Sequence, residues 1–386
     1  MSKSNETTPN VPTLRFKSFE QEWEYSTIGK CSISLEYGMN AAAVKYDGKH
    51  KYIRITDIDE ETSAFIPNPL SSPDGEFEQR YLVKENDILF ARTGASVGKS
   101  YLYNSNDGEL YFAGFLIRAR IKPEYNGPFI YYQTKSKKYD RWVKLTSMRS
   151  GQPGINSQEY SGYPIAITGK VEQDKIAYFF QMLDNRISVQ NKIISKYETL
   201  IKGIRERIVN CGWQWKKLDE LIQEGVVRLN RGNIIPKHPE DNTYKYPVYS
   251  SSTQNNGLMG YNDTYMFDKE LITWSIDGGG NFFYRKKHKF NVTNVCGIMQ
   301  VDENVYSYRF IAEMLTYQHS KMKFDYQSKA HPSVISSLYS LPCLPISEQN
   351  SYCRLFIALD RKIQIEQQSL CKLKEQKKYL LSKMFI

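Results

Sequence analysis

An internal repeat constrains the fold of this chain more than any other feature of its sequence. The two copies read EQDKIAYFFQMLDNRI at 172–187 and EQNSYCRLFIALDRKI at 348–363, and they share six of sixteen positions at a constant offset of 176. Each copy follows a stretch containing proline, which disfavours helix in the residue before it, and each opens a run of about forty residues without proline. A repeat on this scale indicates a duplicated structural unit. We therefore expect two related halves, each ending in a long helix.

The apolar residues of the two long helices predict that the helices pair with each other. They recur at alternating steps of four and three residues from Ile176 to Ile208, and again from Tyr352 to Met384, which is the spacing of a coiled-coil seam. Gln190 and Glu366 occupy the same position in the two seams, where a polar residue helps to specify register. The residues expected to pair are Phe180, Leu183, Ile187, Ile194, Phe356, Leu359, Ile363 and Leu370. The alternative is that each helix lies on its own domain as an ordinary amphipathic helix.

The segments before the helices predict two globular units of the α+β class. Trp23 with Ile28 matches Trp213 with Leu218 at an offset of 190, so the repeat extends into both units. Short strand-like segments separated by turns predict twisted, mainly antiparallel sheets, and the two long antiparallel helices should separate the units in a pseudo-two-fold repeat. The expected division is a tail at 1–19, a first unit at 20–162, a central helix at 163–210, a second unit at 211–340 and a final helix at 341–386.

The charge balance favours a polyanionic partner. The chain carries 52 Lys and Arg against 42 Asp and Glu, a formal charge of +10, which suits nucleic acid but also occurs in proteins that are merely soluble. No apolar run is long enough to cross a membrane and the first residues do not resemble a secretory signal, so we expect no membrane partner and a cytoplasmic location. The six Cys and five His show no metal-ligand spacing, and we expect no metal site.

The first unit contains a polar loop that could contact a nucleic acid. The segment GASVGKS at 94–100 lacks the G-x-x-x-x-G-K-[ST] spacing of a phosphate loop and precedes a strand-like stretch, which argues against nucleotide hydrolysis. Its polar residues and those of the basic stretch and loop at 135–156 suit contacts with phosphates and base edges. The candidates are Arg92, Thr93, Ser96, Lys99, Lys135, Lys138, Arg149, Gln152 and Asn156.

The second unit offers a comparable set of residues in different loops. Serine, asparagine and glutamine cluster at 250–256, a basic run follows at 285–289, and the stretch at 328–342 parallels 150–164 of the first unit. The candidates are Ser251, Ser252, Gln254, Asn255, Asn256, Asn281, Arg285, Lys286, Lys287, Lys329 and His331. Singly, such residues are also common in solvated loops. Their recurrence in both halves of a basic chain favours DNA binding.

Taken together, these motifs resemble the specificity (S) subunits of type I restriction-modification systems. The resemblance spans nearly the whole chain and rests on LRF at 14–16, EWE at 22–24, DILFARTGASVGKS, YPVYSSSTQNNG and the two EQ-headed helices. It implies a non-catalytic subunit with two target-recognition domains that read an asymmetric bipartite site in double-stranded DNA. It also implies that the chain docks two modification subunits, which methylate adenine N6, and restriction subunits. Any S-adenosylmethionine, ATP and Mg²⁺ would then belong to those partners, and this chain would hold no cofactor.

Two other classes of function are less consistent with the sequence. A stand-alone methyltransferase or nuclease is disfavoured because no NPP[YF]-type motif, phosphate loop or metal-ligand cluster is found. A coiled-coil scaffold that binds only proteins would explain the helices. It would not explain two divergent, basic, turn-rich units.

Overall fold

The computed structural model describes residues 10–75, 77–252, 254–277, 279–322 and 329–386. The chain forms two compact units, of which unit 1 comprises Met1–Gln190 and Ser369–Ile386 and unit 2 comprises Asn191–Gln368. Both long helices are present, α5 over Lys170–Asn210 and α9 over Ile346–Met384. Each unit therefore contains half of each long helix.

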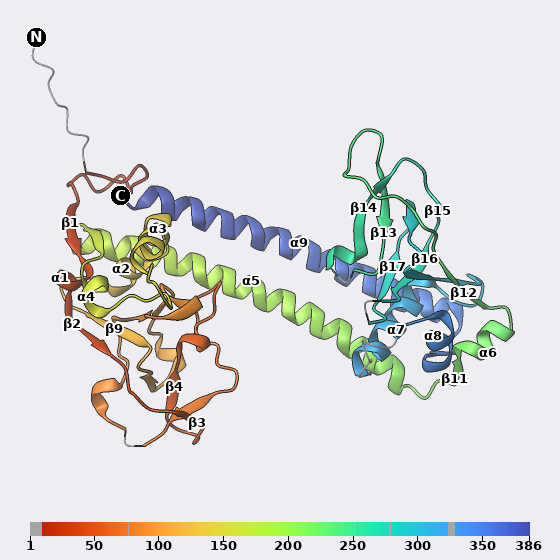
Figure 1. Ribbon diagram of the computed structural model, residues 1–386, viewed down its shortest axis with the longest axis horizontal. Helices are drawn as coiled ribbons and strands as arrows, with labels where there is room; N and C mark the ends of the chain where they lie inside the picture. The colour runs from red at the N-terminus through yellow and green to blue at the C-terminus, as the bar shows by residue number, and fades with distance from the viewer. Residues whose placement is uncertain (1–9, 76, 253, 278, 323–328) are drawn as a thin grey trace, which may run out of the picture. The chain divides into compact units, whose positions relative to one another are not determined.

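Unit 1 is built around a four-stranded antiparallel sheet in the order β2-β9-β6-β7 (Figure 1). These strands are β2 (Ser32–Tyr37), β9 (Leu116–Ile121), β6 (Asp87–Ala91) and β7 (Ser100–Leu102). Three pairs of strands accompany it: β1 (Glu24–Thr27) with β10 (Pro164–Ile167), β3 (Ala43–Lys45) with β5 (Ser71–Pro73), and β4 (Lys51–Ile53) parallel to β8 (Leu110–Phe112). The short helices are α1 (Ile28–Cys31), α2 (Gly127–Gln133), α3 (Lys137–Thr146) and α4 (Ser157–Ser161).

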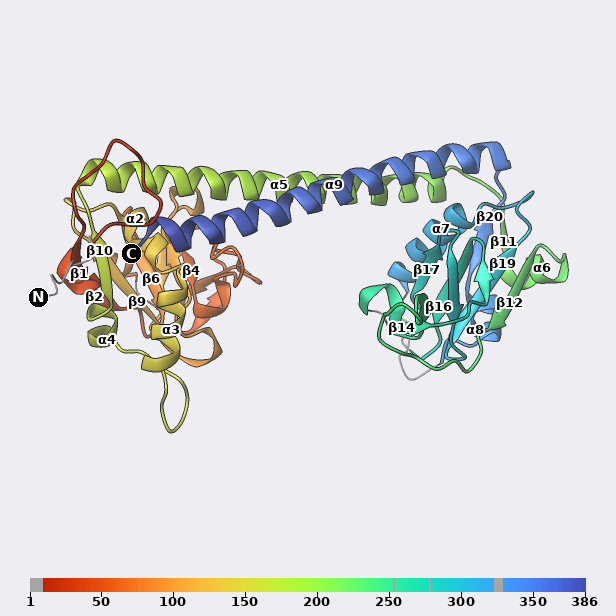
Figure 2. The ribbon, with the colours of Figure 1, turned by 90° about the horizontal axis from the view of Figure 1, so that it is seen from above.

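Unit 2 repeats this plan with the sheet order β12-β19-β16-β17, and Figure 2 shows these four strands side by side. They are β12 (Val227–Arg231), β19 (Cys296–Val301), β16 (Leu271–Ser275) and β17 (Phe282–Arg285). A two-stranded sheet joins β11 (Trp215–Lys217) to β20 (Ser340–Pro342), and a second four-stranded sheet contains β14 (Leu258–Asn262), β13 (Tyr246–Tyr249), β18 (Lys289–Val292) and β15 (Phe267–Asp268). The helices are α6 (Leu218–Gln223), α7 (Tyr308–Lys321) and α8 (Pro332–Leu338).

The duplication predicted from the sequence is confirmed at the level of single hydrogen bonds. The backbone N–H of Ile28 donates to the carbonyl of Tyr163 at 3.1 Å, and the N–H of Leu218 donates to the carbonyl of Tyr339 at 3.0 Å. The first strand of each main sheet, β2 or β12, is followed directly by a glycine, Gly38 or Gly232, where a Cβ would lie 2.3 Å or 2.1 Å from a backbone oxygen. Only glycine fits at this position, in both halves.

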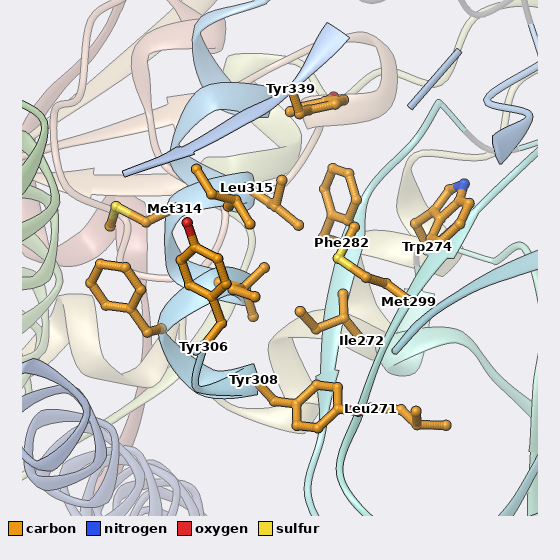
Figure 3. Close-up of a cluster of buried hydrophobic side chains, with 14 of the residues drawn as sticks. Leu271, Ile272, Trp274, Phe282, Met299, Tyr306, Tyr308, Met314, Leu315 and Tyr339 are labelled. Atoms are coloured by element: carbon orange, nitrogen blue, oxygen red, sulfur yellow. The ribbon is translucent and has the colours of Figure 1, made fainter. Parts of the chain in front are cut away.

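The core of unit 2 joins its main sheet to α7 (Figure 3). Ile272 and Met299 face each other across β16 and β19, and both are fully buried. Figure 3 shows Leu315 of α7 facing Phe282 of β17, with Trp274 on the other side of that ring. Unit 1 has a matching core in which Trp23, Phe129 and Phe180 pack with Phe385 at the end of α9.

The two long helices share the core of each unit along the seam expected from their spacing. In unit 1, Phe180 stacks on Phe385 with ring centroids 5.7 Å apart, while Lys377 forms an ion pair with Asp184. Rising residue numbers in α5 therefore meet falling numbers in α9, so the helices are antiparallel. All eight residues expected to pair are buried or half-buried: Phe180, Leu183, Ile187, Ile194, Phe356, Leu359, Ile363 and Leu370.

Residues 10–19, which the sequence assigns to a tail, pack on unit 1. The N–H of Leu14 donates to the carbonyl of Lys383 at 2.9 Å, and Arg15 forms an ion pair with the buried Glu172 at 2.7 Å. The ring of Phe16 meets Phe179 edge-on at 6.0 Å. Residues 1–9 of the expected tail lie outside the described residues.

The repeated glutamine at the start of each long helix ties the helix to its unit. Gln173 donates from Nε2 to the carbonyl of Thr168 at 2.6 Å and accepts from the N–H of Asn126 at 2.9 Å. Gln349 donates to the carbonyl of Leu344 at 2.9 Å and accepts from the N–H of Ser307 at 3.0 Å. Both side chains are almost completely buried. Both halves therefore have glutamine at this position because its side chain makes the same hydrogen bonds to the backbone in each unit.

We expect Gln173→Ala and Gln349→Ala each to lower the free energy of unfolding by about 1–3 kcal/mol, because each leaves buried backbone groups without a partner. Urea unfolding followed by tryptophan fluorescence measures this loss. Gln181→Ala and Gln367→Ala, at exposed positions on the same helices, are the matched controls. Equal stability of the buried and the exposed variants would contradict the prediction.

Candidate nucleic-acid interface

In unit 1, two of the loops that carry candidate residues meet at the carboxyl end of β6. The N–H of Gly94 donates to the carbonyl of Pro153 at 3.0 Å. Gly94 has a φ of +70°, and a Cβ at this position would lie 3.0 Å from Nε2 of Gln152. The glycine therefore permits both the turn and the close approach of the second loop. This arrangement brings together Arg92, Thr93 and Gln152.

Tyr37 belongs to the same site, although the sequence reasoning missed it. The guanidinium of Arg92 lies 4.7 Å above the ring of Tyr37, and the Tyr37 hydroxyl accepts the N–H of Ser157 at 3.1 Å. Hydrogen bonding with Ser157, first through its side chain and then through this N–H, lowers the pKa of Tyr37, and the nearby charge of Arg92 adds to the effect. The only local signal was an aromatic residue at the end of a strand, directly before Gly38. Tyr37 thus orients the arginine that the sequence selected.

Arg149 and Asn156 form part of the internal structure of the second loop. Arg149 pairs with Glu159 at 2.6 Å and donates to the carbonyl of Thr146 at 2.7 Å. The Asn156 side chain caps α4 by accepting the N–H of Glu159 at 2.9 Å. Both residues are exposed. Their side chains are nevertheless already engaged, and their first role is to shape the loop.

Lys135 does not lie on the outer surface as the sequence analysis expected. Its ammonium donates to the hydroxyls of Ser63 and Ser100, both at 2.8 Å, and lies 4.5 Å from the ring centre of Tyr131. Burial lowers the pKa of Lys135 to about 7. The neighbouring cations Lys137 and Lys138 are exposed, but Lys135, just beyond the end of α2, points its side chain inward.

The remaining candidates of unit 1 divide between a helix face and a turn. Lys138 is exposed on α3, together with Lys137, Arg141 and Lys144, so this helix presents a basic face. Ser96 and Lys99 are half-buried in the turn that leads to β7. The carbonyl of Lys99 accepts the N–H of Ala91 at 2.8 Å, which closes the turn.

In unit 2, three loops gather at the carboxyl end of β16, the equivalent place. The hydroxyl of Ser275 donates to the carbonyl of Ser251 at 2.6 Å, and the Ser275 N–H donates to the carbonyl of Asn281 at 3.1 Å. Lys329 pairs with Asp277 at 3.2 Å, which attaches the third loop. Its neighbour His331 is half-buried at the start of α8. The two units thus share a frame and differ in the residues that it presents.

The turn Gln254–Gly257 presents three polar side chains in succession. Gln254, Asn255 and Asn256 are all exposed. Asn255 and Asn256 have φ values of 47° and 50°, in the left-handed region that asparagine tolerates better than most residues. The hydroxyl of Ser252 accepts the N–H of Gln254 at 3.2 Å and supports the start of the turn. Exposed amides in such a turn suit hydrogen bonds to base edges.

Arg285 is buried, which corrects its expected place among exposed basic residues. It is only 4% exposed, its Nε donates to Thr273 Oγ1 at 2.9 Å, and its guanidinium lies 3.6 Å from the ring centre of Tyr249. Burial lowers the pKa of Arg285 to about 10. Arg285 is the last residue of β17 and points inward, while Lys286 and Lys287 beyond the strand are exposed.

Among the described residues, no three His, Cys, Asp or Glu side chains lie close enough to hold a metal ion. None of the helices over these residues is long and apolar enough to cross a membrane.

Two copies of one α+β frame, each with polar loops at the end of its central strand, define a protein with two recognition units. The family model for the type I restriction modification DNA specificity domain matches residues 21–199 and 210–375, which is most of the chain. The chain belongs to this family.

Curated relatives match parts of the chain. A type I specificity subunit of Mycoplasma pneumoniae, S.MpnORF285P, is 36% identical over 132 residues, which are 32% of this chain and 42% of that protein. The specificity subunit of the type I restriction enzyme MpnII, from the same organism, is 29% identical over 128 residues, which are 32% of this chain and 39% of that protein. The matched stretch is less than half the length of either relative.

Solved structures share the fold over nearly the whole chain. The S subunit of a type I restriction-modification system from M. genitalium covers 97% of this chain and 99% of its own length, with a TM-score of 0.66 and 17% identity. A chain from work on complex assembly and conformational transition of the type I R-M system covers 94% and 97%, with a TM-score of 0.53 and 12% identity. These similarities support the fold assignment.

Proposed function

We propose that this chain is the specificity subunit of a type I restriction-modification complex and that each unit reads one half of an asymmetric site in double-stranded DNA. One observation carries the proposal: the same frame presents Arg92, Thr93 and Gln152 in unit 1 and a different set around Ser251, Asn281 and Lys329 in unit 2. Equivalent positions with different polar side chains suit the recognition of two different base sequences. The formal charge of +10 supports contact with phosphates.

The same proposal assigns the chemistry to other subunits. The chain would be non-catalytic and would work in the cytoplasm, docking two modification subunits that methylate adenine N6 as well as restriction subunits. S-adenosylmethionine, ATP and Mg²⁺ would belong to those partners. Family membership and the shared fold of known S subunits support this division of roles.

Arg92→Ala tests the reading of one half-site. We expect affinity for the cognate duplex to fall about 10- to 100-fold and the sequence preference to relax at one or two positions of a single half-site, because one arginine reads one or two bases. The chain reconstituted with its modification subunits would methylate a randomised duplex library, and sequencing the modified sites would report both half-sites.

Lys217→Ala, an exposed lysine in β11, is the matched control and should leave both half-sites unchanged. An equal loss of affinity for cognate and unrelated duplexes in Arg92→Ala would mean that Arg92 contacts only phosphates. Unchanged affinity and preference would exclude Arg92 from the interface.

A further inference from the structure

Unit 2 contains an open hollow of about 600 Å³ beside the turn Gln254–Gly257. Asn256 of that turn lines one side, and the stretch from Phe282 to His288 forms a wall. Residues of α7, including Arg309 and Glu313, also line it. The hollow therefore adjoins the candidate DNA interface and is not part of the apolar core.

Arg285 lines this hollow as a buried cation, and no salt bridge to a carboxylate is found for it among the described residues. Its Nε donates to the hydroxyl of Thr273, and its guanidinium lies over the rings of Tyr249 and Phe283. Its Nη2 is buried and has no hydrogen-bond partner within the described part of the chain. Buried charges and donors are normally paired, and leaving one unpaired costs about 1–3 kcal/mol. An anionic ligand that reaches this donor would complete its bonding.

The remaining charges of the hollow select an anion. Lys286 and Lys287 are exposed beside Arg285, and Arg309 of α7 also lines the hollow, where it pairs with Glu313 and Asp360. Among the described residues that line the hollow, Glu313 is the only acidic one, and it is already bound by Arg205 and Arg309. The hollow is therefore strongly positive, which excludes a metal cation and disfavours a neutral ligand.

The geometry of Arg285 suits a phosphate in particular. A guanidinium stacked on an aromatic ring has its plane fixed, and its planar donors match the oxygens of a phosphate. A Cβ at Gly257 would lie 3.3 Å from Arg285 Nη2, so the free donor lies directly beside the turn that carries Gln254, Asn255 and Asn256. A phosphate bound here would adjoin the side chains placed to read bases.

We propose that this hollow is a phosphate-binding site of unit 2, with Arg285 as its buried cation and Lys286 and Lys287 at its rim. The source of the phosphate is the backbone of the bound duplex, so the inference rests on the proposed function. A free nucleotide or inorganic phosphate carries the same chemistry, and the experiment below separates these sources.

Duplex affinity is measured as a function of salt for the full chain reconstituted with its modification subunits. The variants are Arg285→Lys, which keeps the charge but loses the planar fork, and the double variant Lys286→Ala with Lys287→Ala. We expect each to weaken cognate binding about tenfold or more, and the Lys double variant to reduce the slope of log affinity against log salt by about 1 per lost contact. Lys217→Ala is the control for loss of a surface charge. In parallel, calorimetry measures pyrophosphate binding to the full chain alone.

The outcomes separate failure of this inference from failure of the proposed function. If wild type binds the duplex and both variants bind equally tightly with the same salt slope, the hollow holds no phosphate while the proposed function stands. If wild type binds no duplex, the proposed function fails, and the pyrophosphate measurement decides: binding lost in Arg285→Lys supports a site for free phosphate, and absence of binding refutes it. If Arg285→Lys does not fold by circular dichroism, the Lys double variant alone decides.

Discussion

Asp87→Leu is expected to lower the free energy of unfolding of unit 1 by about 3–5 kcal/mol, and adding Arg118→Ile is expected to restore most of this loss. Asp87 is fully buried at the start of β6, where its carboxylate accepts two bonds from Arg120, both at 2.9 Å. Arg118 is 1% exposed, and its Nε lies 3.8 Å from the same carboxylate. Removing Asp87 alone leaves a buried cation without its nearest buried anion.

In unit 2 the equivalent positions of the main sheet carry apolar residues in place of these charges. The carbonyls of Leu116 and Cys296 both accept the N–H of the glycine that follows the first strand of the main sheet, so these two residues are equivalent. Counting from them along β9 and β19 makes Arg118 equivalent to Ile298. The pairing of these strands with β6 and β16 then makes Asp87 equivalent to Leu271. Both unit 2 residues are apolar and buried. In the double variant, Arg120 and Glu36 are left without these partners, but they are 28% and 48% exposed and can reach water. Replacing a buried ion pair by apolar residues is often neutral or stabilising.

Urea unfolding of the two single variants and the double variant measures the coupling between the sites. Glu85→Leu, at an exposed position two residues from Asp87, controls for an apolar substitution that breaks no ion pair. If the losses of unfolding free energy in the two single variants simply add in the double variant, the apolar pair of unit 2 cannot replace the ion pair of unit 1.

Gly297→Ile is expected to cost at least about 3 kcal/mol or to prevent unit 2 from folding, because a Cβ at Gly297 would lie 2.0 Å from the indole of Trp274. Trp274→Phe alone is expected to cost about 1–3 kcal/mol, since it leaves a cavity and removes the Nε1 donor to the carbonyl of Ala330 at 2.7 Å. The double variant, Gly297→Ile with Trp274→Phe, should have a free energy of unfolding within about 1.5 kcal/mol of the wild-type value.

The reason for this compensation again lies in the repeat. Trp274 opposes Gly297 in unit 2, and the equivalent residues of unit 1, Phe90 and Ile117, oppose each other in the same register. Unit 2 pairs the large ring of Trp274 with a glycine, and unit 1 pairs the smaller ring of Phe90 with the branched side chain of Ile117. Near-ultraviolet circular dichroism and urea unfolding would follow the three variants. Gly151→Ile, where an added Cβ meets nothing within 4 Å, controls for the loss of a glycine.

The sequence predicted the parts of this fold that depend on periodicity and repetition. The four-three spacing identified the buried stripe of α5 and α9, and the shared residues Gln173 and Gln349 mark bonds that both halves make. The glutamines are recognisable because the same local contact occurs twice. Asp184 and Asp360 are also identical in the repeat, but their ion-pair partners differ: Lys377 of α9 for Asp184 and Arg309 of α7 for Asp360.

Side-chain direction within the loops could not be predicted in the same way. Lys135 and Arg285 lie in basic runs, yet both point inward, because each stands at the end of a helix or strand, where local packing decides which cation of a run faces solvent. Tyr37 was missed because its partners Arg92 and Ser157 are distant in sequence and meet it only after the sheet has formed. Contacts of this kind depend on tertiary packing.

The division of α9 between the units has a consequence for synthesis of the protein. The core of unit 1 includes Leu381, Met384 and Phe385, which pack with Trp23, Phe129 and Phe180. These three residues leave the ribosome only after all of unit 2 has been made. Unit 1 is therefore the first to be translated and the last that can complete its core, and until then its apolar surface would be open to chaperones or to aggregation.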